Sequence, residues 1–350
     1  MSPFRVNPHV AQLPPYVPGE RAPERGGIKL NSNENPYPPS PTVTDVFRAF
    51  TSEGARVYAD PHCVELRHAI GERLGFEPAR VKVGNGADEL LRVIAHTFAK
   101  AGDRVGMLEP TYSLYPLLCQ MFGLETQLFP VDFRGRLEVE PDLTDIAIFY
   151  IANPNPPYGT WYEPDWIDQL AVKYENCMMV VDEAYVDFTP GDCLELARRR
   201  ENVIVTRTFS KSYSLAGIHV GFALGAERAM GLMNPVHDPY NVNAICQEAA
   251  LAAWNDEAYF KESVRRINES RERVLPALAA LGYEVSDSVG NFLFARHPQA
   301  REIYQQLKAK GLLVRFFDYP PLDTGVRISI GTDAQLDQLL EQLVELNKQL

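Results

Sequence analysis

Apolar and polar residues follow two different periods along the middle of this chain. Between about residues 45 and 250, apolar runs of strand length alternate with segments that have the apolar periodicity of helices. The pattern predicts helices at 64–74, 89–99, 112–122 and 166–174, and strands at 80–83, 104–108, 146–152, 178–182 and 203–207. Apolar strands separated by helices indicate an α/β fold with a mainly parallel sheet covered on both faces. Ligands of such sheets bind beyond the carboxyl ends of the strands.

The two ends of the chain have different patterns. The first 45 residues are rich in proline, as in P-P-Y-V-P-G at 14–19, and cannot form long helices. Apolar residues such as Ile28 and Leu30 indicate an arm that docks on the rest of the protein, with disorder as the alternative. After Trp254, a long charged helix at 260–278 leads into short strands and helices, the pattern of a small α+β domain. We therefore expect an arm at 1–45, a large domain at 46–255 and a small domain at 256–350.

Composition narrows the functional classes. Of the 350 residues, 45% are hydrophobic and 23% are charged, and the net charge of −12 argues against a surface for nucleic acid or an anionic membrane. The five cysteines are scattered without a C-x-x-C pair, which indicates reduced thiols in a cytoplasmic protein and neither a disulfide framework nor a metal site. We find neither a charged-then-apolar leader nor an apolar run of membrane-spanning length, so we expect neither export nor membrane insertion.

Two chemically distinctive residues follow successive predicted strands. Asp182 closes the run M-M-V-V-D, and Lys211 comes after V-I-V-T-R in the sequence F-S-K-S. Parallel strands would bring both side chains to one edge of the sheet. A pyridine-aldehyde cofactor needs this pair, because the lysine amine forms a Schiff base with the aldehyde and the carboxylate keeps the ring nitrogen protonated. A solvent-facing lysine and an aspartate that caps a helix are the alternatives.

A glycine turn after the strand at 80–83 predicts an anion site. In V-K-V-G-N-G-A-D-E-L-L, Gly86, Ala87 and Asp88 begin a helix, and the free N–H groups of its first turn can bind a phosphate. The segment is not a dinucleotide fingerprint, because Glu89 occupies the position of the third glycine, so we do not expect a nicotinamide-dependent dehydrogenase. A plain glycine turn is compatible with both interpretations.

Nine stretches along nearly the whole chain resemble the aspartate-aminotransferase superfamily of pyridoxal-5'-phosphate (PLP) enzymes, which have fold type I. They are L-P-P-Y-V-P-G, N-S-N-E-N-P-Y, V-Y-A-D-P, G-N-G-A-D-E, E-P-T-Y-S-L-Y, N-P-N-P-P-Y-G, V-V-D-E-A-Y-V-D-F, F-S-K-S-Y-S-L-A-G and V-R-I-S-I-G-T. Within this superfamily they are most similar to the histidinol-phosphate aminotransferases. The resemblance implies a large domain with a mainly parallel mixed sheet flanked by helices, a small α+β domain, and a homodimer in which the arm packs on the small domain and on the partner subunit.

The resemblance also implies which residues contact the cofactor ring. Lys211 would hold the cofactor and then move the proton between substrate and cofactor, and Asp182 would pair with the ring nitrogen. Tyr185 would donate a hydrogen bond to the cofactor's O3′ oxygen. Tyr112 would stack on the pyridine ring, unless it is a core aromatic residue.

Further implied contacts concern the cofactor phosphate. Ser210 would add its hydroxyl to the N–H groups of the turn at 86–88. Tyr58 would add a second hydroxyl from across the interface of the homodimer. An ordinary interface tyrosine is the alternative for Tyr58.

Substrate contacts are implied at both ends of the chain. Arg327, in V-R-I-S-I, would clamp the substrate carboxylate in a bidentate manner, because an arginine within a short apolar strand needs an anionic partner. Arg315 would hold the distal phosphate of histidinol phosphate, and Tyr16 and Asn33 of the arm would close the pocket. A structural ion pair for Arg327 and a surface ion pair for Arg315 are the alternatives.

Three positions depart from the family pattern. Pro156 occupies the place of an asparagine that contacts O3′, so this contact would be lost, left to Tyr185 or taken by Asn155 after a local shift. Tyr158 replaces a threonine. His219 replaces an arginine that binds the phosphate, and a histidine, unlike an arginine, loses its charge near neutral pH.

The resemblance implies a PLP-dependent aminotransferase of histidine biosynthesis. The expected reaction converts L-histidinol phosphate and 2-oxoglutarate into imidazole-acetol phosphate and L-glutamate. An aminotransferase for aromatic or other amino acids, a threonine-phosphate decarboxylase and a non-catalytic PLP-binding regulator are the alternatives.

Overall fold

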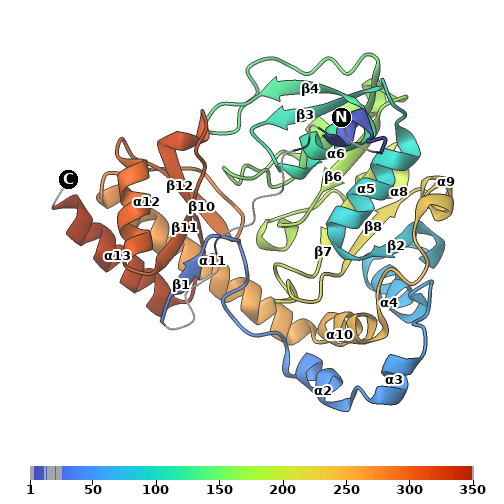
Figure 1. Cartoon of the computed structure of the whole chain (residues 1–350), viewed down its shortest axis with the longest axis horizontal. Coiled ribbons are helices and arrows are strands. Elements are labelled where there is room, and N and C mark those ends of the chain that lie inside the picture. The colour runs from blue at the N-terminus through green and yellow to red at the C-terminus, as the bar shows by residue number, and fades with distance from the viewer. Residues whose placement is uncertain (1–3, 12, 14–19, 21–25, 349–350) are drawn as a thin grey trace.

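The larger of two sheets lies toward one end of the molecule (Figure 1). The computed structural model describes residues 4–11, 13, 20 and 26–348. The seven strands lie in the order β2-β8-β7-β6-β5-β3-β4. Their bounds are β2 Val81–Gly84, β3 Arg104–Glu109, β4 Glu125–Pro130, β5 Ile146–Ala152, β6 Met178–Asp182, β7 Val203–Thr208 and β8 Gly221–Gly225.

This sheet is parallel except at one strand. Strands β7, β6, β5, β3 and β4 pair in parallel, whereas β8 runs antiparallel to both β7 and β2. The sequence pattern predicts the strands corresponding to β2, β3, β5, β6 and β7, but we did not predict β4 or β8. Strand β8 has the sequence G-F-A-L-G, whose terminal glycines weaken a strand signal.

Alternate residues of the central strands fill two separate cores. In β7, Val203 and Val205 pack into one hydrophobic cluster, and Ile204 packs into the other. In β6, Val181 belongs to the first cluster and Val180 to the second. Because side chains alternate across a strand, a sheet covered on both faces requires apolar residues at every position. The continuous apolar runs of the sequence follow from this requirement.

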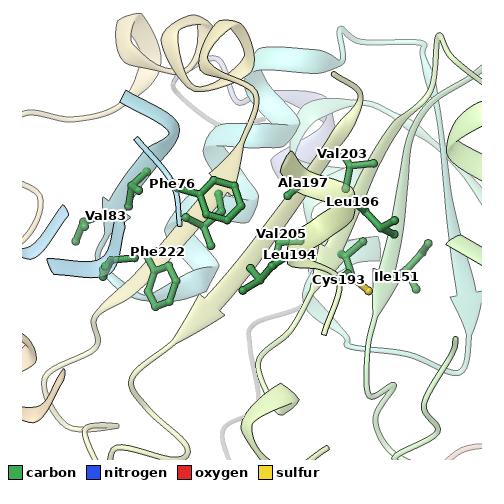
Figure 2. Close-up of a cluster of buried hydrophobic side chains, with 14 of the residues drawn as sticks. Phe76, Val83, Ile151, Cys193, Leu194, Leu196, Ala197, Val203, Val205 and Phe222 are labelled. Atoms are coloured by element: carbon green, nitrogen blue, oxygen red, sulfur yellow. The ribbon is translucent and has the colours of Figure 1, made fainter. Parts of the chain in front are cut away.

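Helices cover both faces of the large sheet. The first cluster includes side chains from α4 (Val64–Leu74), α7 (Pro164–Lys173), α8 (Leu194–Arg199) and α10 (Ala244–Asn255). Figure 2 shows part of it, with Leu194 and Leu196 of α8 beside Val203 and Val205 of β7. The second cluster includes residues of α5 (Gly86–Phe98), α6 (Leu114–Phe122) and α9 (Glu227–Leu232).

A smaller sheet lies at the other end of the molecule (Figure 1). Its order is β1-β11-β12-β10-β9, with β1 parallel to β11 and the other neighbours antiparallel. The bounds are β1 Ile28–Leu30, β9 Glu284–Val285, β10 Phe292–Arg296, β11 Leu312–Phe316 and β12 Gly325–Ser329. Helices α11 (Glu257–Ala280), α12 (Ala300–Ala309) and α13 (Asp333–Asn347) pack on it through the apolar residues of a third cluster.

Segments before the large sheet complete the described chain. Strand β1 lies within the predicted arm and adds to the edge of the small sheet. The remaining short helices are α1 Pro8–Ala11, α2 Pro41–Ala49 and α3 Ser52–Arg56. The division of the chain at residues 45 and 255 stays a prediction. None of the helices in the described part of the chain combines the length and the apolar character needed to cross a membrane.

Candidate active site

A cavity opens beyond the carboxyl ends of the parallel strands, where the sequence predicts a ligand. Residues from β5, β6 and the segment after β7 line it together with the start of α5. The lining residues are Ala87, Asp88, Tyr112, Ala152, Pro156, Asp182, Ala184, Tyr185, Thr208, Ser210, Lys211, Ala216 and His219. Eight of the predicted site residues are therefore brought together from positions 87 to 219.

Asp182 is buried at the end of β6 and accepts hydrogen bonds from neutral donors. Tyr115 Oη donates to Oδ2 at 2.8 Å, and the Ala184 N–H and Thr206 Oγ1 donate to Oδ1 at 3.2 and 3.4 Å. Among the described residues, no ion pair joins this carboxylate to a cation. Burial raises the pKa of Asp182 to about 6, against the effect of the Tyr115 hydrogen bond. The site therefore contains a carboxylate that would be stabilised by a cationic ligand.

Lys211 reaches the same cavity from the turn after β7. Its Nζ donates to the carbonyl oxygen of Ser32 at 3.4 Å and lies 5.7 Å from the centre of the Tyr185 ring. The amine therefore lies between the arm and the end of β6. A ligand in the cavity can contact Asp182 and Lys211 at the same time, as the sequence predicts.

The start of α5 and the segment after β7 form the anion-binding side of the cavity. Ala87 and Asp88 line it from the first turn of α5, whose N–H groups have no partner within the helix. Ser210 and His219 line it from the other side. A Cβ at Gly86, which has φ +74°, would lie 2.6 Å from the His219 ring, so only glycine permits this approach.

His219 has a defined orientation on the anion-binding side of the cavity. Its Nδ1 lies 3.0 Å from Asn85 Oδ1, and its backbone has a φ of +55°. The ring therefore lies against the helix start. This position is compatible with a phosphate ligand.

Two tyrosines of one segment serve different parts of the site. Tyr112 lines the cavity, and its hydroxyl donates to Asp88 Oδ1 at 3.1 Å. Tyr115 lies beneath it, with the two rings perpendicular at 5.6 Å, and holds Asp182. Burial raises the pKa of both hydroxyls far above the usual range, so both remain donors at neutral pH. The placement of Tyr112 allows a ring to stack on it.

The arm and the small sheet contact the cavity through Tyr185. Asn33 Nδ2 donates to Tyr185 Oη at 3.0 Å, and Ser329 Oγ of β12 donates to Asn33 Oδ1 at 3.0 Å. The Tyr185 ring meets Phe292 of β10 edge to face at 4.9 Å. The Arg327 guanidinium lies 5.6 Å from the Phe292 ring. A continuous path of contacts therefore joins the cavity to the predicted substrate arginine.

Arg315 and Arg327 are directly opposite each other in the small sheet. Their Cα atoms are register partners of β11 and β12. Both guanidinium groups lie near the Phe317 ring, at 5.3 and 5.7 Å, and Arg327 also donates to the Asn31 carbonyl at 3.0 Å. Two cations held side by side favour a ligand with a multiply charged anionic group.

Other predicted residues lie apart from the cavity. The Asn155 amide donates to the Pro110 carbonyl at 2.9 Å and accepts from Thr111 at 2.6 Å, while Pro156 lines the cavity. Tyr58 is 83% exposed and stacks on Tyr240 at 4.5 Å, outside the cavity. Tyr16 lies outside the described residues.

Tyr158, which departs from the family pattern, is buried away from solvent. It packs edge to face on Phe133 and Phe294, in each case at 5.3 Å. Phe294 belongs to β10 of the small sheet. The substitution therefore adds an aromatic contact between the large-sheet and small-sheet regions.

Sequence reasoning missed several residues of the site. Tyr115 and Thr206 donate hydrogen bonds to Asp182. Other missed residues line the cavity, namely Thr208 and the small residues Ala152, Ala184 and Ala216. The spacing of Tyr112 and Tyr115, three residues apart in a predicted helix, was an available signal for a shared face. The threonines and alanines carry no comparable signal in one sequence.

The residues present fit the cofactor that the sequence implies. The buried carboxylate of Asp182 suits a protonated ring nitrogen, Tyr112 suits a ring face, and Lys211 suits an aldehyde. The helix start with Ser210 and His219 suits a phosphate.

Replacing Asp182 should stabilise the ligand-free protein above pH 6. With a pKa raised to about 6, the buried carboxyl stays mostly neutral up to about pH 6 and is charged at a cost above it, whereas the same carboxyl in the unfolded chain ionises from about pH 4. Over this interval, stability falls by about 3 kcal/mol as pH rises, because the unfolded chain ionises more readily. In Asp182→Asn this fall in stability should disappear. Chemical denaturation at pH 4 and 7.5 would measure the free energy of unfolding of both proteins.

Asp45→Asn is the matched control, because the Asp45 side chain is 72% exposed. It should leave the pH dependence of stability unchanged. An Asp182→Asn protein with the same pH dependence as the wild type would contradict the electrostatic account.

Comparisons with known proteins identify the family. The model of the aminotransferase class I and II family matches residues 25–343. The histidinol-phosphate aminotransferase of Geobacter sulfurreducens is 40% identical over 352 residues, covering 99% of this chain and 100% of that protein.

Solved structures share the fold. The histidinol-phosphate aminotransferase of Sinorhizobium meliloti, solved in complex with pyridoxal-5'-phosphate, is similar with a TM-score of 0.89 and 28% identity, covering 99% of each chain. The L-threonine-O-3-phosphate decarboxylase of Porphyromonas gingivalis has a TM-score of 0.81 at 23% identity, covering 92% of this chain and 100% of that chain, and shows the fold alone. The predicted fold type I is confirmed. The chain belongs to the class I and II aminotransferases.

Proposed function

We propose that this protein is a PLP-dependent aminotransferase that acts on L-histidinol phosphate. Its reaction with 2-oxoglutarate gives imidazole-acetol phosphate and L-glutamate, in histidine biosynthesis. The observation that carries the proposal is the convergence of Asp182, Lys211 and a phosphate-binding helix start on one cavity. The aminotransferase relatives that match the chain over its full length support the same activity.

The site residues have separate roles in this proposal. When bound, PLP supplies a ring that accepts electrons from the substrate's α-carbon. Asp182 would hold the proton on the ring nitrogen, and Tyr112 would orient the ring by stacking. Lys211 Nζ would hold the cofactor and move a proton at the substrate α-carbon. Tyr185 would donate to the ring oxygen from the position in which it contacts Asn33.

The two arginines of the small sheet select the substrate. Arg327 binds the α-carboxylate of glutamate and, because histidinol phosphate has no carboxylate, the phosphate of histidinol phosphate. Arg315 lies directly opposite and adds a second guanidinium. A phosphate has more oxygens and charge than a carboxylate, so two guanidinium groups favour it. Tyr16 would complete this end of the pocket.

The proposal includes a homodimer in the cytoplasm. Tyr58 is the exposed part of an aromatic stack with Tyr240. In a dimer its hydroxyl would reach the cofactor phosphate in the other subunit's cavity. The five cysteines are buried and unpaired, as suits a reducing compartment.

Reduction of the holoenzyme with borohydride tests the central assignment. The treatment should leave a pyridoxyl group on the peptide that contains Lys211, detectable by mass mapping. Lys211→Ala should carry none there and should have lost at least about 10³-fold of the activity, because both covalent binding and proton transfer are removed. A pyridoxyl group on another lysine would overturn the mechanism.

Half-reaction kinetics would identify the amino donor. Histidinol phosphate should convert the bound cofactor at least about tenfold more efficiently than phenylalanine, tyrosine or threonine phosphate. Arg315→Gln should remove most of this preference, while Arg301→Gln, at an exposed arginine paired with Asp318, should not. Carbon dioxide release from threonine phosphate would instead support a decarboxylase, and equal rates for all amines would contradict the proposed substrate.

Cofactor affinity should depend on His219. An arginine offers the phosphate a permanent charge and several N–H donors, and one charge-assisted hydrogen bond is worth about 1.5–3 kcal/mol. His219→Arg should therefore bind PLP about 10- to 100-fold more tightly than the wild type. Equilibrium dialysis would measure both constants.

His68→Arg, at an exposed histidine of α4 outside the cavity, is the control and should bind PLP as the wild type does. Equal PLP affinities of His219→Arg and the wild type would contradict the proposed contact with the phosphate.

A further inference from the structure

A buried ion-pair cluster lies behind the strand ends that carry the site. Glu183 follows Asp182, and Arg207 follows Thr206, the register partner of Asp182. Because side chains alternate across strands, Glu183 and Arg207 point away from the face that holds Asp182 and Thr206. Neither is among the described residues that line the cavity. The proposed reaction therefore assigns them no role.

Glu183 and Arg207 are tightly bonded. Arg207 Nε and Nη2 lie 2.9 and 2.7 Å from Glu183 Oε2, and Nη2 also lies 2.9 Å from Asp192 Oδ2. The Cys193 N–H donates to Glu183 Oε1 at 2.6 Å. The side chains of Glu183 and Arg207 are 0% and 11% exposed. Buried charges with this many bonds lock the relative positions of the β6 and β7 ends.

A second branch of the cluster reaches the turn that carries Lys211. Asp187 and Arg207 line one small cavity, and the Ser212 hydroxyl donates to Asp187 Oδ2. Burial raises the pKa of Asp187, which the Arg207 charge and the Ser212 hydrogen bond oppose. Ser212 itself is 2% exposed, and its carbonyl accepts from Asn35 Nδ2 at 3.1 Å.

The cluster therefore holds the immediate neighbours of two site residues and a residue close to a third. Glu183 adjoins Asp182, Ser212 adjoins Lys211, and Asp187 lies two residues after Tyr185. We propose that Asp187, supported by Arg207, is a positioning residue that fixes the direction of the Lys211 side chain through the Ser212 hydroxyl. The inference rests on the proposed function, because it concerns the amine that holds the cofactor.

The predicted effect concerns geometry at the reacting amine. Without the Asp187–Ser212 bond, the turn at 209–216 loses one of the two side-chain contacts that hold Ser212. The Lys211 amine then samples more directions, so proton transfer slows while substrate binding at the arginines is unchanged. Small misplacements of a reacting group can lower rates by orders of magnitude.

Ser212→Ala tests this role with two readouts. In the ligand-free protein, Lys211 should react about threefold faster with trinitrobenzenesulfonate, relative to Lys100, whose side chain is 85% exposed. Peptide mass mapping measures this ratio without any cofactor. In the holoenzyme, the limiting rate of the half-reaction should fall about tenfold while the half-saturating substrate concentration stays the same. Ser212→Thr keeps a hydroxyl and should restore both values.

Ser270→Ala is the matched control. Ser270 is also a buried serine whose hydroxyl donates to an aspartate, Asp333, at 2.9 Å, but it lies in α11 outside the cavity. It should lower thermal stability without changing either readout. If Ser212→Ala does not fold, Asp187→Ala, which removes the oxygen that accepts the Ser212 hydrogen bond, should show the same two effects.

The outcomes separate two failures. If Ser212→Ala and Asp187→Ala lower only the melting temperature, as Ser270→Ala does, the cluster is structural and the positioning role is wrong. If borohydride leaves no pyridoxyl group on Lys211 of the wild type, the proposed function fails, whatever the labelling of the ligand-free variants shows.

Discussion

A carboxylate that is fully buried beside neutral hydrogen-bond donors is the constraint on which this site depends. Asp182 is held by Tyr115, Ala184 and Thr206, and burial raises its pKa to about 6. Such a group is unfavourable in the ligand-free fold, and the large core around it maintains it there. A cationic ring nitrogen would relieve this cost. The fold thus sacrifices some stability to present a charge that favours one kind of ligand.

At the carboxyl edge of the large sheet, the two faces carry different groups. Asp182 and Thr206 face the cavity side, whereas Glu183 and Arg207 form a buried ion pair on the other side. The cavity-side pair and the ion pair are therefore only one residue apart along each chain segment. Charge and hydrogen bonds fix the neighbours of the proposed reacting groups, which favours a preorganised site.

The small sheet joins this site through aromatic and amide contacts. Asn33 bonds to Tyr185 and to Ser329, and Phe292 lies between the Tyr185 ring and the Arg327 guanidinium. Tyr158 adds a further contact between the two regions. The proposed phosphate and carboxylate clamp is therefore held at a defined place relative to the lysine. Of the departures from the family pattern, Pro156 and His219 line the cavity and Tyr158 is buried outside it. Asp182, Lys211 and Arg327 keep the residue types of the pattern.

The sequence by itself determined the α/β class, most central strands, the family, and the residues that converge on the cavity, because continuous apolar runs and motif order are local properties. It did not indicate β8, Tyr115 as the partner of Asp182, or the engagement of the Asn155 amide by Pro110 and Thr111. Only the tertiary structure decided these, since each depends on which distant segments pack together. The Arg207 cluster is the clearest case. The sequence gives no sign that Glu183, Asp192 and Arg207 are partners, and only strand pairing and burial bring them within hydrogen-bonding distance.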